Sequence, residues 1–242
     1  MRFDGINTEL LNLFRGIPNS DFRLQDFSNL PDIIFRHDVD SSLVAAGVFT
    51  DYLDRLHIQS NFFIRTNSNL YNVSSKASRI ILESISKNHE IGLHIESPNA
   101  FNSIDEFEEN LSRAKDLLEF AVEKKVNLIS WHRPHKVDLS GSEMIYGMLN
   151  LYSSRLFSEY KYLSDSANTW SDEKSQLVKE SIEGKIKLQI LLHPEWWLSS
   201  THLESFDWSI LLQISTQVAE INNENSYHKN SFTLKRLMPD ER

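Results

Sequence analysis

The chain of 242 residues has no cysteine, only seven glycines and six prolines, and no long apolar run. Without cysteine it can form no disulfide, thiolate nucleophile or Cys-ligated zinc site, so a metal site must use His, Asp and Glu. No apolar run approaches the ~18 residues that a membrane-spanning helix needs. Basic residues are in the minority, and the net charge of −9 argues against a nucleic-acid-binding surface.

The organisation of the chain is that of one domain. No low-complexity linker or Pro/Gly-rich seam divides it, and a chain of this length can bury a full core. We predict a single domain over residues 1–242, with residues 1–30 as an outer helix and loop and a less ordered polar tail at 222–242. The amino terminus, MRFDGINTELLNLF, has no continuous apolar core, which indicates a cytoplasmic protein without a secretory signal.

Apolar strands alternate with amphipathic helical patterns. Apolar residues at helical spacing predict helices around 45–56 and 104–118. Ser103 and Glu106 form a capping box, which places a helix start there. Strands about thirty residues apart, each followed by a helix, indicate βαβ units in a parallel barrel or sheet. The predicted strands begin near residues 33, 60, 90, 126, 160 and 187.

Polar residues collect where these predicted strands end, which is where parallel α/β folds form their sites. The first strand ends in HDVD, and Asp38 and Asp40 point to the same side of it because they are two residues apart. Two such carboxylates repel each other unless a cation or a proton lies between them. The other strand ends supply His94, Glu96, His132, Arg133, Asp165 and His193.

These clusters, in this order, resemble the polysaccharide deacetylase superfamily (NodB-homology, carbohydrate esterase family 4). The closest resemblance is to a divergent branch associated with bacterial surface-polysaccharide gene clusters. It spans residues 33–197 and implies an α/β fold, a distorted (β/α) barrel of about seven parallel strands. In RHDVD, Asp38 resembles the general base of the family and Asp40 its metal-binding aspartate.

The second motif of the family has two histidines four residues apart. Here HEIGLHIESP supplies His94, but Pro98 stands at the other position. Since two protein ligands hold a metal weakly, we expect a third from another strand. Our first choice is His132, so that Asp40, His94 and His132 bind a divalent ion, expected to be zinc. Glu96 is a weaker choice, because it can instead pair with the arginine of the next motif.

The remaining motifs supply the other groups that the resemblance implies. WHRP contains Arg133, which resembles the arginine that orients the catalytic aspartate. SDSANTW contains Asp165 and Trp170, and LLH ends in His193. His193 resembles the general acid, held in orientation by Asp165. His89 precedes its strand, and we expect it to be structural.

The resemblance implies a metal-dependent hydrolase that removes an acetyl group from an N- or O-acetylated sugar or polysaccharide precursor, in surface-polysaccharide biosynthesis. Asp38 would accept a proton from water and His193 would protonate the leaving group. Two alternatives stay open. One is a catalytically degenerate homologue that binds carbohydrate or a partner, and the other is a hydrolase of non-peptide C–N bonds on the same barrel. The tryptophans at the same rim suit either a sugar ring or simple packing: Trp131, Trp196 and Trp197.

Overall fold

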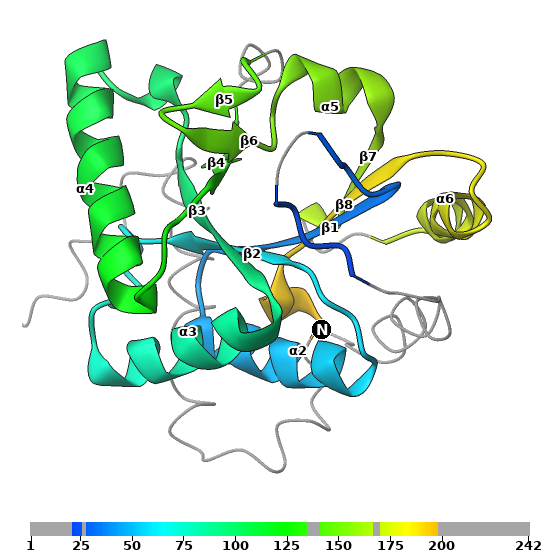
Figure 1. Ribbon diagram of the computed structural model, residues 1–242, viewed down its shortest axis with the longest axis horizontal. Coiled ribbons are helices and arrows are strands. Elements are labelled where there is room, and N and C mark those ends of the chain that lie inside the picture. The colour runs from blue at the N-terminus through cyan, green and yellow to red at the C-terminus, as the bar shows by residue number, and fades with distance from the viewer. Residues whose placement is uncertain (1–20, 26–27, 135–140, 167–169, 198–242) are drawn as a thin grey trace, which may run out of the picture.

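The computed structural model describes residues 21–25, 28–134, 141–166 and 170–197. An eight-stranded sheet in the order β5-β6-β4-β3-β2-β1-β8-β7 forms its centre (Figure 1). The strands are β1 (Ile33–Val39), β2 (Asn61–Arg65), β3 (Glu90–Glu96), β4 (Leu128–His132), β5 (Met144–Ile145), β6 (Met148–Asn150), β7 (Lys161–Ser164) and β8 (Leu188–Leu192). The helices are α2 (Leu43–Arg55), α3 (Lys76–Asn88), α4 (Ile104–Val122), α5 (Ser154–Glu159) and α6 (Asp172–Ile182), with 3-10 helices η1 (Pro98–Ala100) and η4 (Pro194–Trp196).

The predicted parallel architecture is confirmed. Seven strands are mutually parallel, and β5 alone runs antiparallel, against β6. The barrel is distorted in that it stays open: β5 and β7 end the strand order, and no pairing joins them in the described part of the chain. The six strands expected from the sequence are present, whereas β5 and β6 arise in a segment where no strand was predicted.

Serine residues start the helices. The side chain of each N-cap serine accepts a hydrogen bond from a backbone N–H three residues later, which satisfies an otherwise unpaired donor. The helix start predicted at Ser103 is confirmed, since its Oγ accepts from the N–H of Glu106 at 3.1 Å. The Glu106 carboxylate reaches back to the N–H of Asn102 at 3.0 Å.

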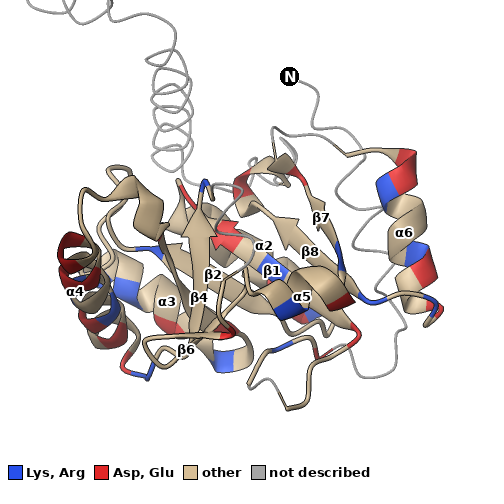
Figure 2. Ribbon diagram, turned by 90° about the horizontal axis from the view of Figure 1, so that it is seen from above, with Lys and Arg blue, Asp and Glu red and all other residues tan. Residues whose placement is uncertain are grey.

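In Figure 2, α4 and α6 flank the sheet at opposite ends, and both carry charged residues of either sign.

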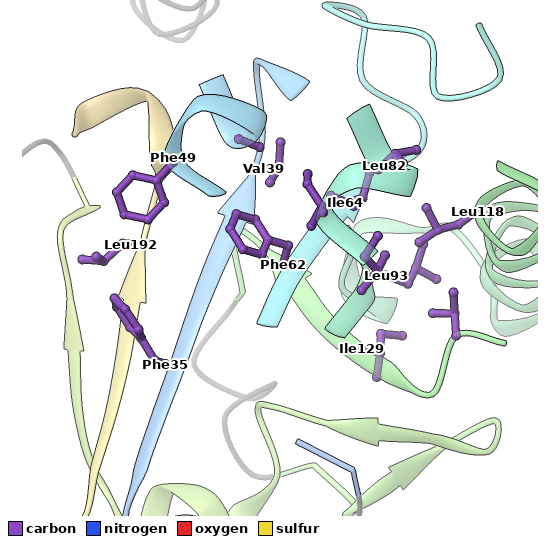
Figure 3. Packing of buried hydrophobic residues seen from close by; sticks show 14 of the residues in the cluster. Phe35, Val39, Phe49, Phe62, Ile64, Leu82, Leu93, Leu118, Ile129 and Leu192 are labelled. Carbon is purple, nitrogen blue, oxygen red and sulfur yellow. The ribbon is translucent and has the colours of Figure 1, made fainter. Parts of the chain in front are cut away.

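The core lies between the sheet and helices α2, α3 and α4. Strands β1, β4 and β8 are buried over their whole length, as expected for parallel strands covered on both faces, so exposed polar residues do not alternate with buried ones along them. Figure 3 shows Phe35, Phe62 and Leu192 of the sheet meeting Phe49 of α2. Each large apolar side chain removed from water in this way contributes roughly 1.5–3 kcal/mol.

The predicted terminal segments lie largely outside the described residues. Of the expected outer helix and loop, only residues 21–25 and 28–30 are described, and Phe22 donates its N–H to the Gln59 carbonyl at 2.8 Å. The polar tail at 222–242 is wholly outside them. None of the helices in the described ranges has the length and apolar character required to cross a bilayer.

A chain of polar groups runs through the core at the opposite end of β3 from the predicted site. His37 Nε2 lies 3.0 Å from Ser60 Oγ, which lies 3.2 Å from His89 Nδ1. His89 Nε2 in turn lies 3.3 Å from an oxygen of Asp54. The His37 ring packs among three phenylalanine rings, and burial lowers its pKa well below the usual 6.5. These contacts give His89 the structural place expected from the sequence.

Acid should therefore destabilise the protein through His37. The folded state keeps this imidazole neutral, while the unfolded chain binds a proton below about pH 6.5, so the free energy of unfolding falls as the pH drops below that value. In His37→Phe the fall between about pH 7 and pH 5, measured by urea denaturation, should be smaller than in the wild type. The exposed His57→Asn variant should keep the wild-type fall. An undiminished fall in His37→Phe would contradict this account.

Candidate active site

Three histidines from three strands surround the carboxylate of Asp40. Asp40 directly follows β1, and its neighbours end or follow β3, β4 and β8. The Nε2 atoms of His94, His132 and His193 lie 3.1, 3.7 and 3.7 Å from oxygens of this carboxylate. The convergence predicted from the strand ends is thus present for these four residues.

The histidines also set the charge of Asp40. Burial alone would raise the pKa of this carboxyl group, but a hydrogen bond with His94 and the charges of all three imidazoles lower it far below its usual range. Asp40 therefore stays ionised. Its Oδ1 atom is buried, and the nearest donor to it is His94 Nε2 at 3.1 Å. An ionised carboxylate among imidazoles is a combination of groups that can bind a divalent cation.

Glu96 orients His132 from the side opposite Asp40. One oxygen of Glu96 lies 3.4 Å from His132 Nδ1 and accepts from Arg65 Nη2 at 2.7 Å, and the other accepts from Asn67 at 2.8 Å. Burial would raise the pKa of Glu96, but these three partners lower it well below the usual range. An ionised Glu96 accepts the Nδ1 proton and leaves the Nε2 lone pair of His132 facing Asp40. Glu96 thus supports a candidate ligand and pairs with Arg65, not with the arginine after His132.

The donor set of Asp40, His94 and His132 fits a divalent ion in its chemistry. One carboxylate and two imidazoles are ligands of catalytic zinc sites, which keep a further position open. Ligand bonds of 2.0–2.1 Å in a tetrahedron place neighbouring donors roughly 3.3 Å apart. The observed separations of 3.1 and 3.7 Å lie on either side of that value. As placed here, however, no group of three His, Asp or Glu side chains within the described ranges could hold a metal ion, so these three would have to move to bind one.

Asp38, the predicted base, lies inside the protein against Arg36. Only 2% of its surface is exposed, and Arg36 Nη2 lies 3.1 Å from its Oδ2. Arg36 is fully buried, donates to the Tyr152 hydroxyl at 2.7 Å, and stacks on the Tyr152 ring at 4.6 Å. Ser130 Oγ lies 3.4 and 3.5 Å from the two Asp38 oxygens, and His94 Nε2 lies 3.7 Å from one of them. Asp38 is therefore held by residues of its own strand and of β3 and β4.

The arginine beside Asp38 is not Arg133, the residue predicted from the sequence. Arg133 is exposed, has a left-handed φ of 50°, and forms no hydrogen bond or ion pair through its side chain within the described residues. The left-handed turn takes the chain away from the sheet directly after His132. Arg36 was the overlooked signal: an arginine inside an apolar run, two residues before Asp38, shares its face of β1.

The fourth and fifth motifs meet as predicted. His193 Nδ1 lies 2.6 Å from Asp165, whose other oxygen accepts from the His193 backbone N–H at 2.8 Å and from Trp197 Nε1 at 2.6 Å. The Trp170 ring meets the Trp197 ring edge-on at 5.6 Å. Burial would lower the pKa of His193, but Asp165 and the charge of Asp40 raise it to about 10. The imidazolium of His193 thus has a proton on Nε2 to donate.

Two further observations concern the rim of the site. Trp131 is buried and packs against Phe107 at 6.1 Å, which makes it a core residue rather than a sugar platform. Glu195, which the sequence analysis did not single out, accepts a hydrogen bond from Ser41 Oγ at 2.8 Å. Burial raises the pKa of Glu195 to about 7, although His193 opposes this. The site therefore contains a carboxyl group in addition to those of Asp38, Asp40, Glu96 and Asp165.

No family model matches the chain, and no curated protein matches its sequence. Solved structures similar to it include a family 4 acetyl xylan esterase from Clostridium thermocellum in complex with cobalt (14% identity, 67% of this chain and 73% of that one, TM-score 0.44). Another is the catalytic domain of a peptidoglycan N-acetylglucosamine deacetylase from Eubacterium rectale (13% identity, 78% of this chain and 84% of that one, TM-score 0.45). A third is a CE4 family pseudoenzyme from Bacillus anthracis (15% identity, 76% of this chain and 60% of that one, TM-score 0.41).

Removing Arg36 should be far more costly than removing Arg133. Arg36→Met leaves the Asp38 carboxylate buried without its cation, which should lower the free energy of unfolding by about 3–5 kcal/mol. Arg133→Met removes an exposed charge and should change it by less than about 0.5 kcal/mol. Urea denaturation of both variants measures the difference. Equal effects would contradict the pairing of Arg36 with Asp38.

The charge of Asp165 should control the protonation of His193. In Asp165→Asn the pKa of His193 should fall from about 10 towards the usual 6.5, because the carboxylate that stabilises the imidazolium is lost. NMR titration of the His193 ring protons measures this change. Asp172→Asn, an exposed substitution on α6, is the matched control and should leave the titration of His193 as in the wild type. A pKa of His193 that Asp165→Asn does not lower would refute the role of this carboxylate.

Proposed function

We propose that this protein is a metal-dependent hydrolase that removes the acetyl group from an N- or O-acetylated sugar, as a cytoplasmic step of surface-polysaccharide biosynthesis. The observation that carries the proposal is the grouping of Asp40 with three imidazoles beside a second carboxylate, Asp38. Such a grouping provides an ion-binding set, a base and an acid within one site. The motif resemblance supplies the acetylated sugar as the substrate class.

Asp40, His94 and His132 would hold the ion, with zinc as the first candidate. When bound, the ion would supply Lewis acidity, which polarises the acyl carbonyl and favours ionisation of the attacking water. Glu96 fixes the tautomer of His132 for this task, because it accepts the Nδ1 proton.

Asp38 is the proposed general base. Arg36 donates to its Oδ2, which leaves acceptor capacity on Oδ1. Asp38 takes one proton from the water molecule as the oxygen of that water bonds to the acyl carbon. Its orientation is set from within the sheet by Arg36 and Ser130, so it does not depend on a loop.

His193 is the proposed general acid. As the bond between the acyl carbon and the sugar nitrogen or oxygen breaks, Nε2 of the imidazolium gives its proton to the leaving atom. The Asp165 carboxylate holds Nδ1–H and stabilises the charged form beforehand. The products are acetate and the free amine or hydroxyl of the sugar.

A catalytically degenerate homologue that binds carbohydrate or a partner is the second candidate. One observation favours it: Pro98 begins η1 at the position of the missing second-motif histidine, and its side chain has no ligating atom. Metal content and acetate release together distinguish the two candidates.

The test compares the wild-type protein with two aspartate variants. Zinc-loaded wild type should release acetate from acetylated sugar oligomers, and a chelator should stop the release. Asp38→Asn should lower turnover by at least about 100-fold while metal stays bound, since a proton acceptor is lost. Asp40→Asn should lose metal and turnover together. Full metal occupancy in both variants would refute this division of roles, and metal-loaded wild type without acetate release would favour the degenerate homologue.

A further inference from the structure

The β2–α3 loop (residues 66–75) contacts the backbone of β1 at the point where the chain reaches Asp40. The Tyr71 hydroxyl donates to the Val39 carbonyl at 2.7 Å and accepts from the Arg65 N–H at 3.1 Å. Val39 lies opposite Ile64 in the pairing of β1 with β2, so this hydroxyl bridges the two strands just beyond that pair. Burial, and then the charge of Asp40, raise the pKa of the Tyr71 hydroxyl well above the usual 10, so it keeps the proton that it donates.

A second side chain of this loop holds the next carbonyl of the chain. Ser68 Oγ donates to the Asp40 carbonyl at 3.1 Å and accepts from the Leu70 N–H at 3.2 Å. The Val39 carbonyl belongs to the peptide group before the Asp40 Cα, and the Asp40 carbonyl belongs to the peptide group after it. Because a peptide group is planar, holding both carbonyls restricts the backbone rotation on either side of that Cα. The loop thereby restricts the direction in which the Asp40 side chain leaves the backbone.

The same segment also reaches the support of His132. Arg65 Nη2 and Asn67 Nδ2 donate to the two oxygens of Glu96 at 2.7 and 2.8 Å. Glu96 in turn lies 3.4 Å from His132 Nδ1, and His132 Nε2 lies 3.7 Å from Asp40. One short stretch of chain therefore contacts the backbone of Asp40 and the carboxylate that orients one of its neighbours.

We propose that the β2–α3 loop positions the candidate site, with Tyr71 and Ser68 as positioning residues that place the Asp40 carboxylate among its three imidazoles. The meaning of this inference for catalysis rests on the proposed function, but the bridge and the position of Asp40 can be measured without it. The Tyr71 hydroxyl donates one hydrogen bond and accepts another within the protein. Tyr71 therefore acts through Asp40 and not on a substrate.

A purely structural role is the competing explanation. Buried backbone carbonyls and N–H groups need partners wherever they lie, and the Tyr71 hydroxyl supplies one to each strand. In that case its loss would leave Asp40 and the histidines around it in place. Nε2 atoms of His94, His132 and His193 lie 3.1 to 3.7 Å from the Asp40 oxygens, so their ring signals report a displacement of the carboxylate. The two explanations thus predict different NMR spectra.

Tyr71→Phe and Tyr160→Phe, compared with the wild type in the full-length chain, test the proposal. Each substitution keeps the aromatic ring and removes one hydroxyl that donates to a backbone carbonyl. The Tyr160 hydroxyl donates to the Pro31 carbonyl at 2.8 Å, before β1 and thus at the opposite end of that strand from Asp40. Tyr160→Phe is therefore a matched control for the loss of the same kind of hydrogen bond away from the site.

In Tyr71→Phe the Arg65 amide should exchange with solvent at least about tenfold faster, because its acceptor is lost. The ring signals of His94, His132 and His193 should shift at a fixed pH. The kcat for acetate release should fall at least about tenfold while KM changes little, as for other residues that support a site from behind its first contacts. The control variant should match the wild type in all three measurements.

Faster exchange at Arg65 with unshifted histidine signals would give Tyr71 a structural role alone and overturn the proposal. Unchanged exchange at Arg65 would also overturn it, since the bridge would then be absent. A wild type that releases no acetate would overturn the proposed function, while the exchange rate and the ring signals still test the proposal. If Tyr71→Phe does not fold, as judged by circular dichroism, Ser68→Ala takes its place and should shift the same ring signals. Unshifted signals in Ser68→Ala would overturn the proposal.

Discussion

The ion pair between Arg36 and Asp38 is made within a single strand, and both side chains are out of water. Either charge alone would be very costly in the centre of the sheet, and the two together are stable only while their hydrogen bonds are satisfied. The hydroxyl and ring of Tyr152 also contact the guanidinium, whose Nε and Nη1 atoms are buried without a hydrogen-bond partner among the described residues. β1 must therefore keep its register, because a shift by one residue would turn both side chains to the other face of the sheet, away from Tyr152.

The fixed register of the parallel strands also explains why the candidate site lies at their carboxyl ends. Parallel strands end together, so a histidine at the end of β3, β4 or β8 reaches the aspartate that follows β1. Two of the three histidines have a supporting carboxylate: Glu96 for His132, and Asp165 for His193. These supports fix which ring nitrogen faces Asp40, and hence whether a side chain acts as a ligand or as a proton donor.

Much of the fold and of the candidate site was predictable from the sequence, and the features that were not predicted were missed for physical reasons. Helix and strand periodicity, the serine caps and the order of the strand ends depend on nearby residues, so the sequence reveals them. The hairpin of β5 and β6 was missed because its strands are two and three residues long. Its signal was the pair Tyr146-Gly147, whose φ values of 47° and 77° suit a tight turn between strands. Glu195 was missed because its contact with Ser41 is set by tertiary packing, which local patterns do not contain. The pairing of Arg36 with Asp38, by contrast, was visible in the spacing of two residues on one strand.

The position of β8 has a consequence for how the protein is made. β8 is the last strand of the described chain, yet it pairs with β1, the first, so that Ile33 lies opposite Leu188 in the middle of the sheet. During synthesis β1 must wait for β8 with one edge unpaired, and such an edge invites association with other chains. Since His193 follows β8, the complete site also cannot exist in a nascent chain that has not reached this strand. Folding at the ribosome and assembly of the site therefore finish together.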